Sequence, residues 1–338
     1  MIKKMLLLMS FSCFVLAGIN DNNNAWMKGG STSNGTSQKR ENHGFFIRGD
    51  VKVLKMQEEN LAFVLEKDDT SAFEDLKAIN PDFDWNLGFR AGLGYITGHD
   101  DIEVNANWYY FYGKGDRSIE KQSDTTLIPL FNVGAVPIGQ TFFSANGHIK
   151  TQVHQIDLNL AKLFVVGTRL FIKAAAGLEA MWMRQGYTIK YLFLDQQLNP
   201  ADTDEFGSRM HFWGIGPKFA LHSFWQLFRK IGPIAEIDAS MFYGVFKTTN
   251  EFIKNDTTQE RLVNHYRITR FVLNALLGLE FRHWFEKSDV HLRFRLGWEN
   301  AIYFDQGRMV QFSLQPVFNM IPGDLTYQGW IFGFYLGF

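Results

Sequence analysis

The sequence contains a single cysteine, Cys13, so an internal disulfide and a cysteine-based zinc site are both excluded. Positive and negative charges are nearly balanced, with a formal net charge of −1 at pH 7. The sequence therefore lacks the excess of positive charge that is typical of nucleic-acid-binding proteins. Past residue 20 there is no run of about 18 apolar residues, the length that a membrane-spanning helix needs. Aromatic residues, in contrast, are abundant at 16%, and they are interspersed with polar residues.

The first residues have the composition of an export signal. Lys3 and Lys4 precede an apolar stretch from 5 to 16, and the small residues Ala17 and Gly18 follow it. This order is typical of a secretory signal peptide, so we expect residues 1–18 to be removed by cleavage.

A lipoprotein signal, with Cys13 acylated, is the alternative, but Ser10 to Ser12 match a lipid-attachment box poorly. Residues 19–43 are rich in Gly, Ser, Thr and Asn and cannot bury a core. They predict a disordered polar linker, followed by one domain over 44–338.

From residue 44 onward, apolar and polar residues alternate with a period of two. Between 83 and 95 the odd positions are apolar or aromatic, and the even positions are polar or glycine. Side chains alternate across a β-strand, so each such segment has one apolar and one polar face. About ten strong segments follow this pattern; they begin near residues 45, 83, 102, 154, 170, 213, 231, 270, 290 and 329.

The connections between these segments alternate in expected length. Short ones fall near 98–101, 165–168, 222–230 and 285–288, and long ones near 57–82, 113–150, 186–207, 247–266 and 305–325. Turns at one rim and loops at the other are typical of an up-and-down antiparallel barrel. Short strands inside the long connections, such as 61–65 or 187–194, would raise the strand number to 12 or 14.

The side on which the apolar face lies separates two kinds of barrel. A soluble barrel or secreted sandwich buries the apolar face, whereas a transmembrane β-barrel turns it toward lipid. Tryptophans near segment ends, including Trp85, Trp182 and Trp298, favour the membrane, where such residues form interfacial belts. We therefore expect a bacterial outer-membrane barrel with short periplasmic turns and long extracellular loops, in contact with outer-membrane lipid.

The last segment has the form of an assembly signal for the barrel-assembly machinery. It ends the chain on alternating aromatic and apolar residues: Trp330, Phe332, Phe334, Leu336 and Phe338.

Charged residues on the polar faces are the candidates for lining the lumen. The candidates are Arg90, Glu103, Asp157, Lys173, Glu179, Glu236, Asp238, Arg270, Arg282, Arg293, Arg295 and Glu299. Both signs are represented about equally, so these residues predict no strong ion selectivity. Two outcomes remain open. Either arginine side chains form a row along one wall, a positive ladder, that orients solutes, or the charges pair and fill a closed interior. Leu127 to Ile138 could likewise fold inward as a plug or pack on the outer rim.

Several blocks resemble the major-outer-membrane-protein-like, pore-forming barrels of chlamydia-related bacteria and legionellae. The blocks lie at 83–95, 177–185, 213–217, 277–285, 296–299 and 323–329, in this order, and the resemblance spans roughly 44 to 338. It implies a porin-like surface protein that admits small solutes. The chlamydial protein is cysteine-rich and cross-linked, whereas the expected mature chain has no cysteine, so a cross-linked envelope role does not carry over.

Motifs for catalysis or a metal are weak. The sequence lacks G-x-S-x-G, H-E-x-x-H and the P-loop pattern. Glu236 and Asp238 could form a hydrolase site with a histidine from a neighbouring strand, although such acids more often pair with arginines in a lumen.

We therefore expect no enzyme, cofactor or metal. The predicted function is an outer-membrane pore for small hydrophilic solutes, with a non-conducting adhesin or structural barrel as the alternative and a barrel hydrolase as the less favoured one. A homo-oligomer is a further possibility.

Overall fold

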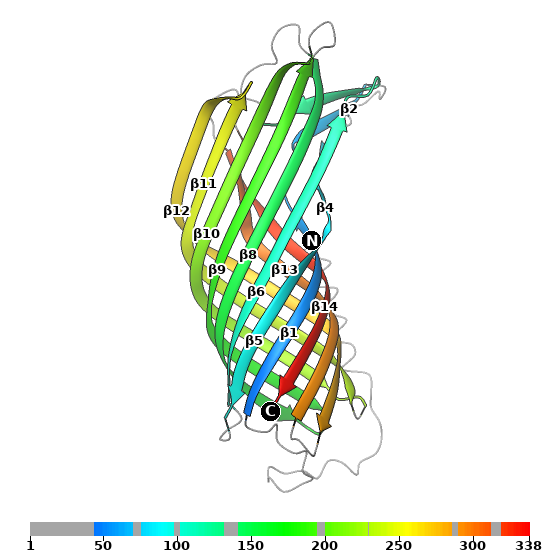
Figure 1. Ribbon diagram of the computed structural model, residues 1–338, viewed down its shortest axis with the longest axis vertical. Helices are drawn as coiled ribbons and strands as arrows, with labels where there is room; N and C mark the ends of the chain where they lie inside the picture. Colours follow the sequence, from blue (N-terminus) through cyan, green and yellow to red (C-terminus); the bar gives the residue numbers. More distant parts are fainter. Residues whose placement is uncertain are drawn as a thin grey trace. The chain divides into compact units, whose positions relative to one another are not determined.

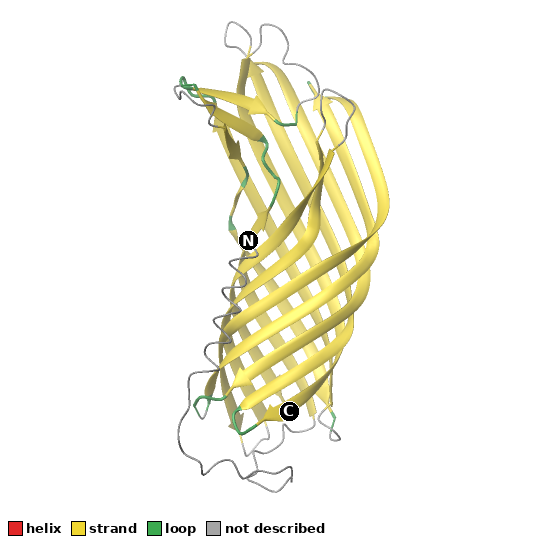
Figure 2. Cartoon of the chain, turned by 180° about the vertical axis from the view of Figure 1, so that it is seen from behind, coloured by secondary structure: helices red, strands yellow, loops and turns green. Residues whose placement is uncertain are grey.

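The structure is a computed structural model, and the signal peptide and linker predicted for 1–43 lie outside its described residues. It describes residues 44–69, 76–97, 102–131, 141–194, 200–228, 230–285, 290–311 and 319–338. None of the described residues forms a helix long and apolar enough to cross a membrane. In Figure 2 the described chain is strand, joined by short loops.

Ten long strands build one large antiparallel sheet. They are β1 (Gly44–Glu58), β5 (Trp85–Ile96), β6 (Ile102–Glu120), β8 (Thr141–Val166), β9 (Leu170–Leu194), β10 (Pro200–Trp225), β11 (Ile231–Lys254), β12 (Thr257–Phe285), β13 (Val290–Gln311) and β14 (Asn319–Gly337). Four short strands accompany them: β2 (Val64–Asp68), β3 (Leu76–Ile79), β4 (Asp82–Phe83) and β7 (Thr125–Pro129).

The sheet closes on itself because β1 pairs with β14 on one side and with β5 on the other. The two strands from opposite ends of the domain lie side by side, β1 in blue and β14 in red (Figure 1). The register runs from Phe46 opposite Gly337 to Glu58 opposite Leu325. A closed ring leaves no unpaired strand edge, which is the condition for a sheet to stand in lipid. The expected all-β, up-and-down antiparallel barrel is therefore confirmed.

The period-two pattern places the apolar face outside and the polar face inside. On β10, Trp213, Phe219 and Leu221 are exposed, whereas Lys218 on the other face is buried. The apolar band is defined here as the outward stretch of each strand that carries apolar residues. It covers residues 45–53 of β1, 172–182 of β9, 213–221 of β10, 231–245 of β11 and 271–281 of β12. Nine to eleven residues suffice for a strand to cross a bilayer, so the apolar band is long enough to do so.

Three of the five expected long loops, 186–207, 247–266 and 305–325, are wrong, because the strands continue beyond the apolar band. In 305–325, β13 ends at Gln311 and β14 begins at Asn319. The segment 186–207 is mostly strand, with β9 ending at Leu194 and β10 beginning at Pro200. The segment 247–266 is also strand except at Asn255 and Asp256, a two-residue turn with φ of 46° and 61°. The outward residues there are polar, which had suggested loops.

The extra strands considered within the long connections do not enlarge the barrel. Residues 187–194 are the end of β9. Val64–Asp68 forms β2, which pairs with β3 and β7 in a separate three-stranded sheet. In the described part of the chain the closed ring therefore has ten strands, and the small sheet lies at its far end from the C-terminus (Figure 1).

Candidate functional site: the barrel interior

All twelve candidate lumen residues lie on the inward face of their strands. Arg90 is on β5, Glu103 on β6 and Asp157 on β8; the others lie on β9, β11, β12 and β13. Most of their side chains are buried, and they contact residues of strands that are not their neighbours in the sheet. Contacts that skip a strand can form only across the inside of the barrel.

The first cluster joins both ends of the chain through Asp50 of β1. The Arg295 guanidinium donates from Nε to Asp50 Oδ1 at 2.9 Å and from its Nη1 to Glu236 Oε1 at 2.7 Å. Arg90 donates from Nε to Asp50 Oδ2 at 2.8 Å. One carboxylate therefore serves two guanidinium groups, and β1, β5, β11 and β13 are linked across the lumen.

The second cluster centres on Lys218 of β10. Its Nζ lies 2.8 Å from Asp157 Oδ2 and 3.8 Å from Glu179 Oε1. Asn107 and Asn159 also donate to Asp157, and Ser240 donates to Glu179. This lysine therefore has two carboxylates within reach, as Arg295 does.

Two further ion pairs lie at the same level of the interior. We call the two clusters and these two pairs together the charged layer. The Lys52 ammonium lies 2.7 Å from Glu299 Oε2 and 4.4 Å from the centre of the Tyr109 ring. Lys173 lies 2.9 Å from Glu103 Oε2. With the two clusters, these pairs place charged side chains from eight of the ring's strands inside one section of the barrel.

A histidine does lie beside the acid pair of β11. His222 Nδ1 is 3.3 Å from Glu236 Oε1, and His222 Nε2 is 3.5 Å from Asp238 Oδ1. Glu236 is also held by Arg295, so this trio belongs to the charged layer. The acids thus have both partners that the sequence had suggested, a neighbouring histidine and a lumen arginine.

Three arginines of the expected positive ladder lie against aromatic rings. The Arg282 guanidinium is 3.6 Å from the centre of the Phe224 ring, Arg293 is 4.3 Å from that of Tyr335, and Arg270 is 5.2 Å from that of Phe246. Arg282 also pairs with Glu280 at 2.6 Å, and Arg270 lies 3.7 Å from Asp305. Arg295, by contrast, is in the first cluster, so the arginines do not form one continuous ladder.

Little free space is left between the charged side chains. A cavity of about 40 Å³ lies among Lys52, Arg90, Tyr109 and Lys218, and another of about 20 Å³ lies beside His222. A cavity needs about 10–15 Å³ to hold one water molecule. These two spaces therefore hold water at most, and the described side chains of the charged layer are packed closely around them.

Beyond the charged layer, toward the rim with the small sheet, the interior is mainly apolar, although Arg270 is buried there against the Phe246 ring. This apolar layer is built from fully buried side chains, among them Phe111, Tyr187, Phe206, Phe242 and Phe246. Chain segments from the connections fill its middle: Leu61, Phe63, Val64, Leu127 and Phe131 are buried there.

Hydrogen bonds fix the inward segments to the wall. The Tyr187 hydroxyl donates to the Leu61 carbonyl and the Tyr191 hydroxyl to the Phe63 carbonyl, each at 2.7 Å. The Phe131 ring stacks on Phe206 with centroids 4.8 Å apart. Of the two placements left open for 127–138, the structure shows the inward one for Leu127 and Phe131; residues 132–140 lie outside the described part.

Glu58 is a carboxyl group within this apolar surrounding, past the end of the apolar band on β1. It accepts a hydrogen bond from the Gln185 amide. Burial raises the pKa of Glu58 to about 8, and the Gln185 hydrogen bond opposes the rise.

Sequence reasoning omitted Asp50, Lys52 and His222 from the candidate set, although they take part in the clusters. All three have the inward parity of their strands, so parity alone could have added them. The apolar layer was missed altogether. Its signal was the continued alternation past residue 241, where Phe242 and Phe246 occupy inward positions.

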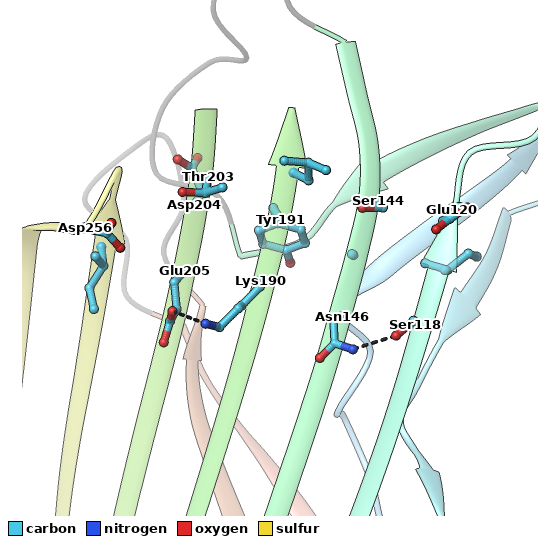
Figure 3. Close-up of a pocket in the computed structure, with 14 residues that line it drawn as sticks. Ser118, Glu120, Ser144, Asn146, Lys190, Tyr191, Thr203, Asp204, Glu205 and Asp256 are labelled. Carbon is cyan, nitrogen blue, oxygen red and sulfur yellow. Dashed lines mark hydrogen bonds and ion pairs between the residues drawn. The ribbon is translucent and has the colours of Figure 1, made fainter. Parts of the chain in front are cut away.

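A cavity of about 500 Å³ lies at the outer rim, lined by residues of β6, β8, β9, β10 and β11 (Figure 3). Its lining is mixed, and some of its polar side chains contact each other: Lys190 pairs with Glu205 at 3.1 Å, and Asn146 donates to Ser118 at 2.6 Å. Among the described residues, no group of three or more His, Cys, Asp or Glu side chains is placed to hold a metal ion. The expected short connection at 98–101 lies outside the described residues.

Comparison with solved structures gives low similarity. The outer membrane protease OmpT from Escherichia coli has 8% identity and a TM-score of 0.40, covering 87% of this chain and 96% of that one. OprG from Pseudomonas aeruginosa has 11% identity and a TM-score of 0.28 (88% and 98% covered). A major outer membrane protein from Thermus thermophilus has 8% identity and a TM-score of 0.29 (86% and 99% covered). We draw no functional argument from them.

No curated protein sequence matches the chain. The family of the Legionella pneumophila major outer membrane protein precursor, however, matches residues 40–338, which is nearly all of the chain and the whole of the barrel. This agrees with the resemblance that the sequence blocks carry. The chain therefore belongs to the Legionella major outer membrane protein family and is a β-barrel protein of the outer membrane.

Proposed function

We propose that the barrel is a narrow pore for ions and small hydrophilic solutes, and that it is closed in the conformation described here. Two barriers close it: the charged layer and the apolar layer. Opening requires the ion pairs to exchange partners and the inward segments around Phe63 and Phe131 to leave the lumen.

The observation that supports a pore is the charged layer itself. Replacing a buried ion pair by apolar residues of similar volume is often neutral or stabilising, so stability alone does not require such pairs. Here Arg295 is shared between Asp50 and Glu236, and Lys218 lies between Asp157 and Glu179. A shared cation can move from one carboxylate to the other at little cost, as a charged gate would require.

The size of the barrel limits what can pass. Barrels of about eight strands are filled by side chains, and water-filled channels are typical of 16–18 strands. A ring of ten strands therefore admits ions and solutes of few atoms. Because both charge signs line the interior, we expect weak ion selectivity.

Planar-bilayer recording of the purified full-length protein tests the pore. We expect small and infrequent openings for the wild type. Asp50→Asn leaves Arg90 and Arg295 with one carboxylate fewer, so openings should become more frequent and anions more permeant. Asp116→Asn, which removes a carboxylate from the outside of β6, is the matched control and should behave like the wild type.

The second candidate is a surface barrel that does not conduct, and the filled apolar layer favours it. Phe63→Ala combined with Phe131→Ala loosens that layer. Both variants should migrate as folded, heat-modifiable barrels. If neither this variant nor Asp50→Asn then shows any opening, the proposal of a pore is wrong and the protein is a non-conducting surface barrel.

The proposal also includes export through the signal at 1–18, removed by cleavage. Mass spectrometry of the protein from outer membranes should find a chain that starts near residue 18 or 19. An unprocessed chain would contradict this part. Hydrolysis is not part of the proposal, because His222, Glu236 and Asp238 lie in the closed charged layer with no room for a substrate.

A further inference from the structure

A patch of basic side chains lies on the outside of the barrel, directly past the apolar band. We call it the basic patch and define it as Lys114, Lys150, Arg184, Arg209, His211 and Lys247. They come from β6, β8, β9, β10 and β11, five strands that run side by side (Figure 1). The five lysines and arginines are exposed, as is His211.

The strand register brings these residues into contact positions. Arg184 is opposite His211, which is opposite Lys247 on its other side. Lys114 is opposite Lys150, and Arg209 lies two positions from His211 on the same face of β10. Side chains directly opposite in a sheet have Cβ atoms about 4.5–5.5 Å apart, and like charges in this arrangement repel.

The titration of His211 reflects this crowding. Its pKa lies below the ordinary value, first because neighbouring atoms desolvate part of the exposed ring and then because Arg184, Lys247 and Arg209 disfavour a further positive charge.

Carboxylates of the protein do not neutralise the basic patch. Within the described part of the chain, none of its lysines and arginines forms an ion pair. Two nearby acids are engaged elsewhere: Glu205 pairs with Lys190 at 3.1 Å (Figure 3), and Glu251 pairs with Arg261 at 3.1 Å. Asp116, two positions from Lys114 on the same face of β6, forms no ion pair among the described residues, and one carboxylate offsets the five cations only in part. An anion from outside the chain would offset the remaining repulsion.

The position of the patch indicates what kind of anion this is. Trp182 and Trp213 are the last outward residues of the apolar band on β9 and β10, and Arg184 and His211 are the next outward residues. A lipid whose chains lie along the apolar band places its headgroup at this level. Arginine and lysine are the side chains that bind phosphate, arginine in a two-pronged geometry.

We propose that the basic patch binds the phosphate groups of an anionic lipid in the outer leaflet. Arg184, Arg209 and Lys247 hold the phosphate, while Trp182 and Trp213 contact the chains below it. The proposal does not depend on whether the lumen conducts.

Competitive quenching of tryptophan fluorescence tests the proposal. The full chain is placed in phosphatidylcholine nanodiscs containing brominated phosphatidic acid, whose phosphate monoester is the probe, or brominated phosphatidylcholine. The patch variant carries Arg184→Gln, Arg209→Gln and Lys247→Gln. The control variant carries Lys77→Gln, Lys190→Gln and Arg261→Gln, which removes the same charge from sites paired with carboxylates.

We expect the wild type and the control variant to prefer phosphatidic acid. One basic residue at an anionic surface contributes about fivefold in affinity, so the patch variant should lose at least that factor. Equal preference in all three proteins, or no preference in the wild type, would overturn the proposal. Inorganic phosphate at matched ionic strength should leave the preference unchanged. If it removes the preference, the occupant is a free anion and the lipid assignment is wrong.

Thermal melting gives a second test. In it, removing the cations should raise stability, whereas in the quenching test it lowers lipid preference. In uncharged detergent the patch variant should melt above the wild type, because repulsion between the cations is removed. Added phosphatidic acid should raise the melting midpoint of the wild type and not that of the variant. A variant that melts below the wild type in both conditions would show that these cations serve the fold and not a lipid.

Discussion

Gly333 shows how one missing side chain makes room for the charged layer. A Cβ atom at this position would meet Asp50 Oδ1 and Arg295 Nε, the two atoms of the central ion pair. Forcing extra atoms into a packed interior usually costs about 1–3 kcal/mol. The glycine on β14 is therefore part of the geometry that lets Arg295 reach Asp50.

Gly333→Ala should separate this ion pair and lower the free energy of unfolding by about 1–3 kcal/mol. Urea unfolding in lipid vesicles measures the change. Gly207→Ala is the matched control, because a Cβ atom at Gly207 would meet no atom within 4 Å. Equal losses in both variants would contradict the steric explanation.

Glu58 predicts a pH dependence of stability. Its pKa is raised from the ordinary 4.5 to about 8, so the folded barrel holds the proton more tightly than the unfolded chain does. The stabilisation is complete below pH 4.5 and is lost as the pH rises through about 8. Glu58→Gln should remove this part of the dependence.

Melting of the barrel in detergent between pH 5 and pH 9 measures the effect. The midpoint of the wild type should fall across this interval more than that of Glu58→Gln. Glu59→Gln, at the exposed neighbouring position, should follow the wild type. Parallel curves for all three proteins would rule out Glu58 as the source.

At this scale the sequence predicts which face a residue occupies but not which partner it finds. Alternation places Arg295 and Glu236 on inward faces. Their contact depends on how far each strand is shifted around the closed ring, and no local pattern encodes that shift. The aromatic rings that Arg282 and Arg293 contact were unforeseen for the same reason.

For a whole strand, the consequence of the register can be tested on β12. Leu277 is 51% exposed on the outward face, and Asn274 faces inward and donates to Glu299 at 2.7 Å. Arginine at the bilayer midplane costs about 2–4 kcal/mol on a lipid-facing position. Leu277→Arg should therefore lower the free energy of unfolding in vesicles by about this amount, and Asn274→Arg by clearly less. Equal losses would mean that the two faces are exchanged.

The last strand carries the proposed assembly signal. Trp330, Phe332, Phe334 and Phe338 are exposed on the outward side of β14 or at its end. Deleting Phe338 should reduce the amount of folded barrel in outer membranes several-fold, while refolding of the purified variant in detergent changes little. Heat-modified mobility on gels measures both. A variant that fails equally in the two settings would indicate lost stability and not lost recognition.

Strand lengths were the weakest part of the sequence-based prediction. The segment 186–207 was expected to be a loop because its outward residues, such as Thr188 and Lys190, are polar. The inward residues Tyr187, Ile189 and Tyr191 continue the alternation and pack in the apolar layer. Outward polarity marks where the lipid ends, and it does not mark where the strand ends.

For the molecule as a whole, the topology predicts which loops are accessible on cells. The turn at Asn255 and Asp256 lies at the rim opposite the C-terminus, and the turn at Gly167 lies at the other rim. A protease-sensitive tag inserted at 255 should be cleaved on intact cells, and one at 167 only after lysis. The reverse result would invert the proposed orientation.

The general architecture was predictable because period two extends through the whole domain and fixes a lipid-facing side. Burial of the 61–64 and 127–131 segments was not, because a short apolar run in a connection fits an inward plug and an outer-rim contact equally well. Only the space inside the finished ring decides between them, and there the Tyr187 and Tyr191 hydroxyls donate hydrogen bonds to the carbonyls of the 61–64 segment.

The pairing of β1 with β14 has a consequence for how such a chain can change over generations. In a closed antiparallel ring, the first and last strands are neighbours and must run in opposite directions. Losing or duplicating a single strand would bring them together in parallel and send one chain end to the wrong side of the membrane. Inherited changes in strand number are therefore expected as whole hairpins, two strands at a time, in keeping with the even strand numbers of bacterial single-chain barrels.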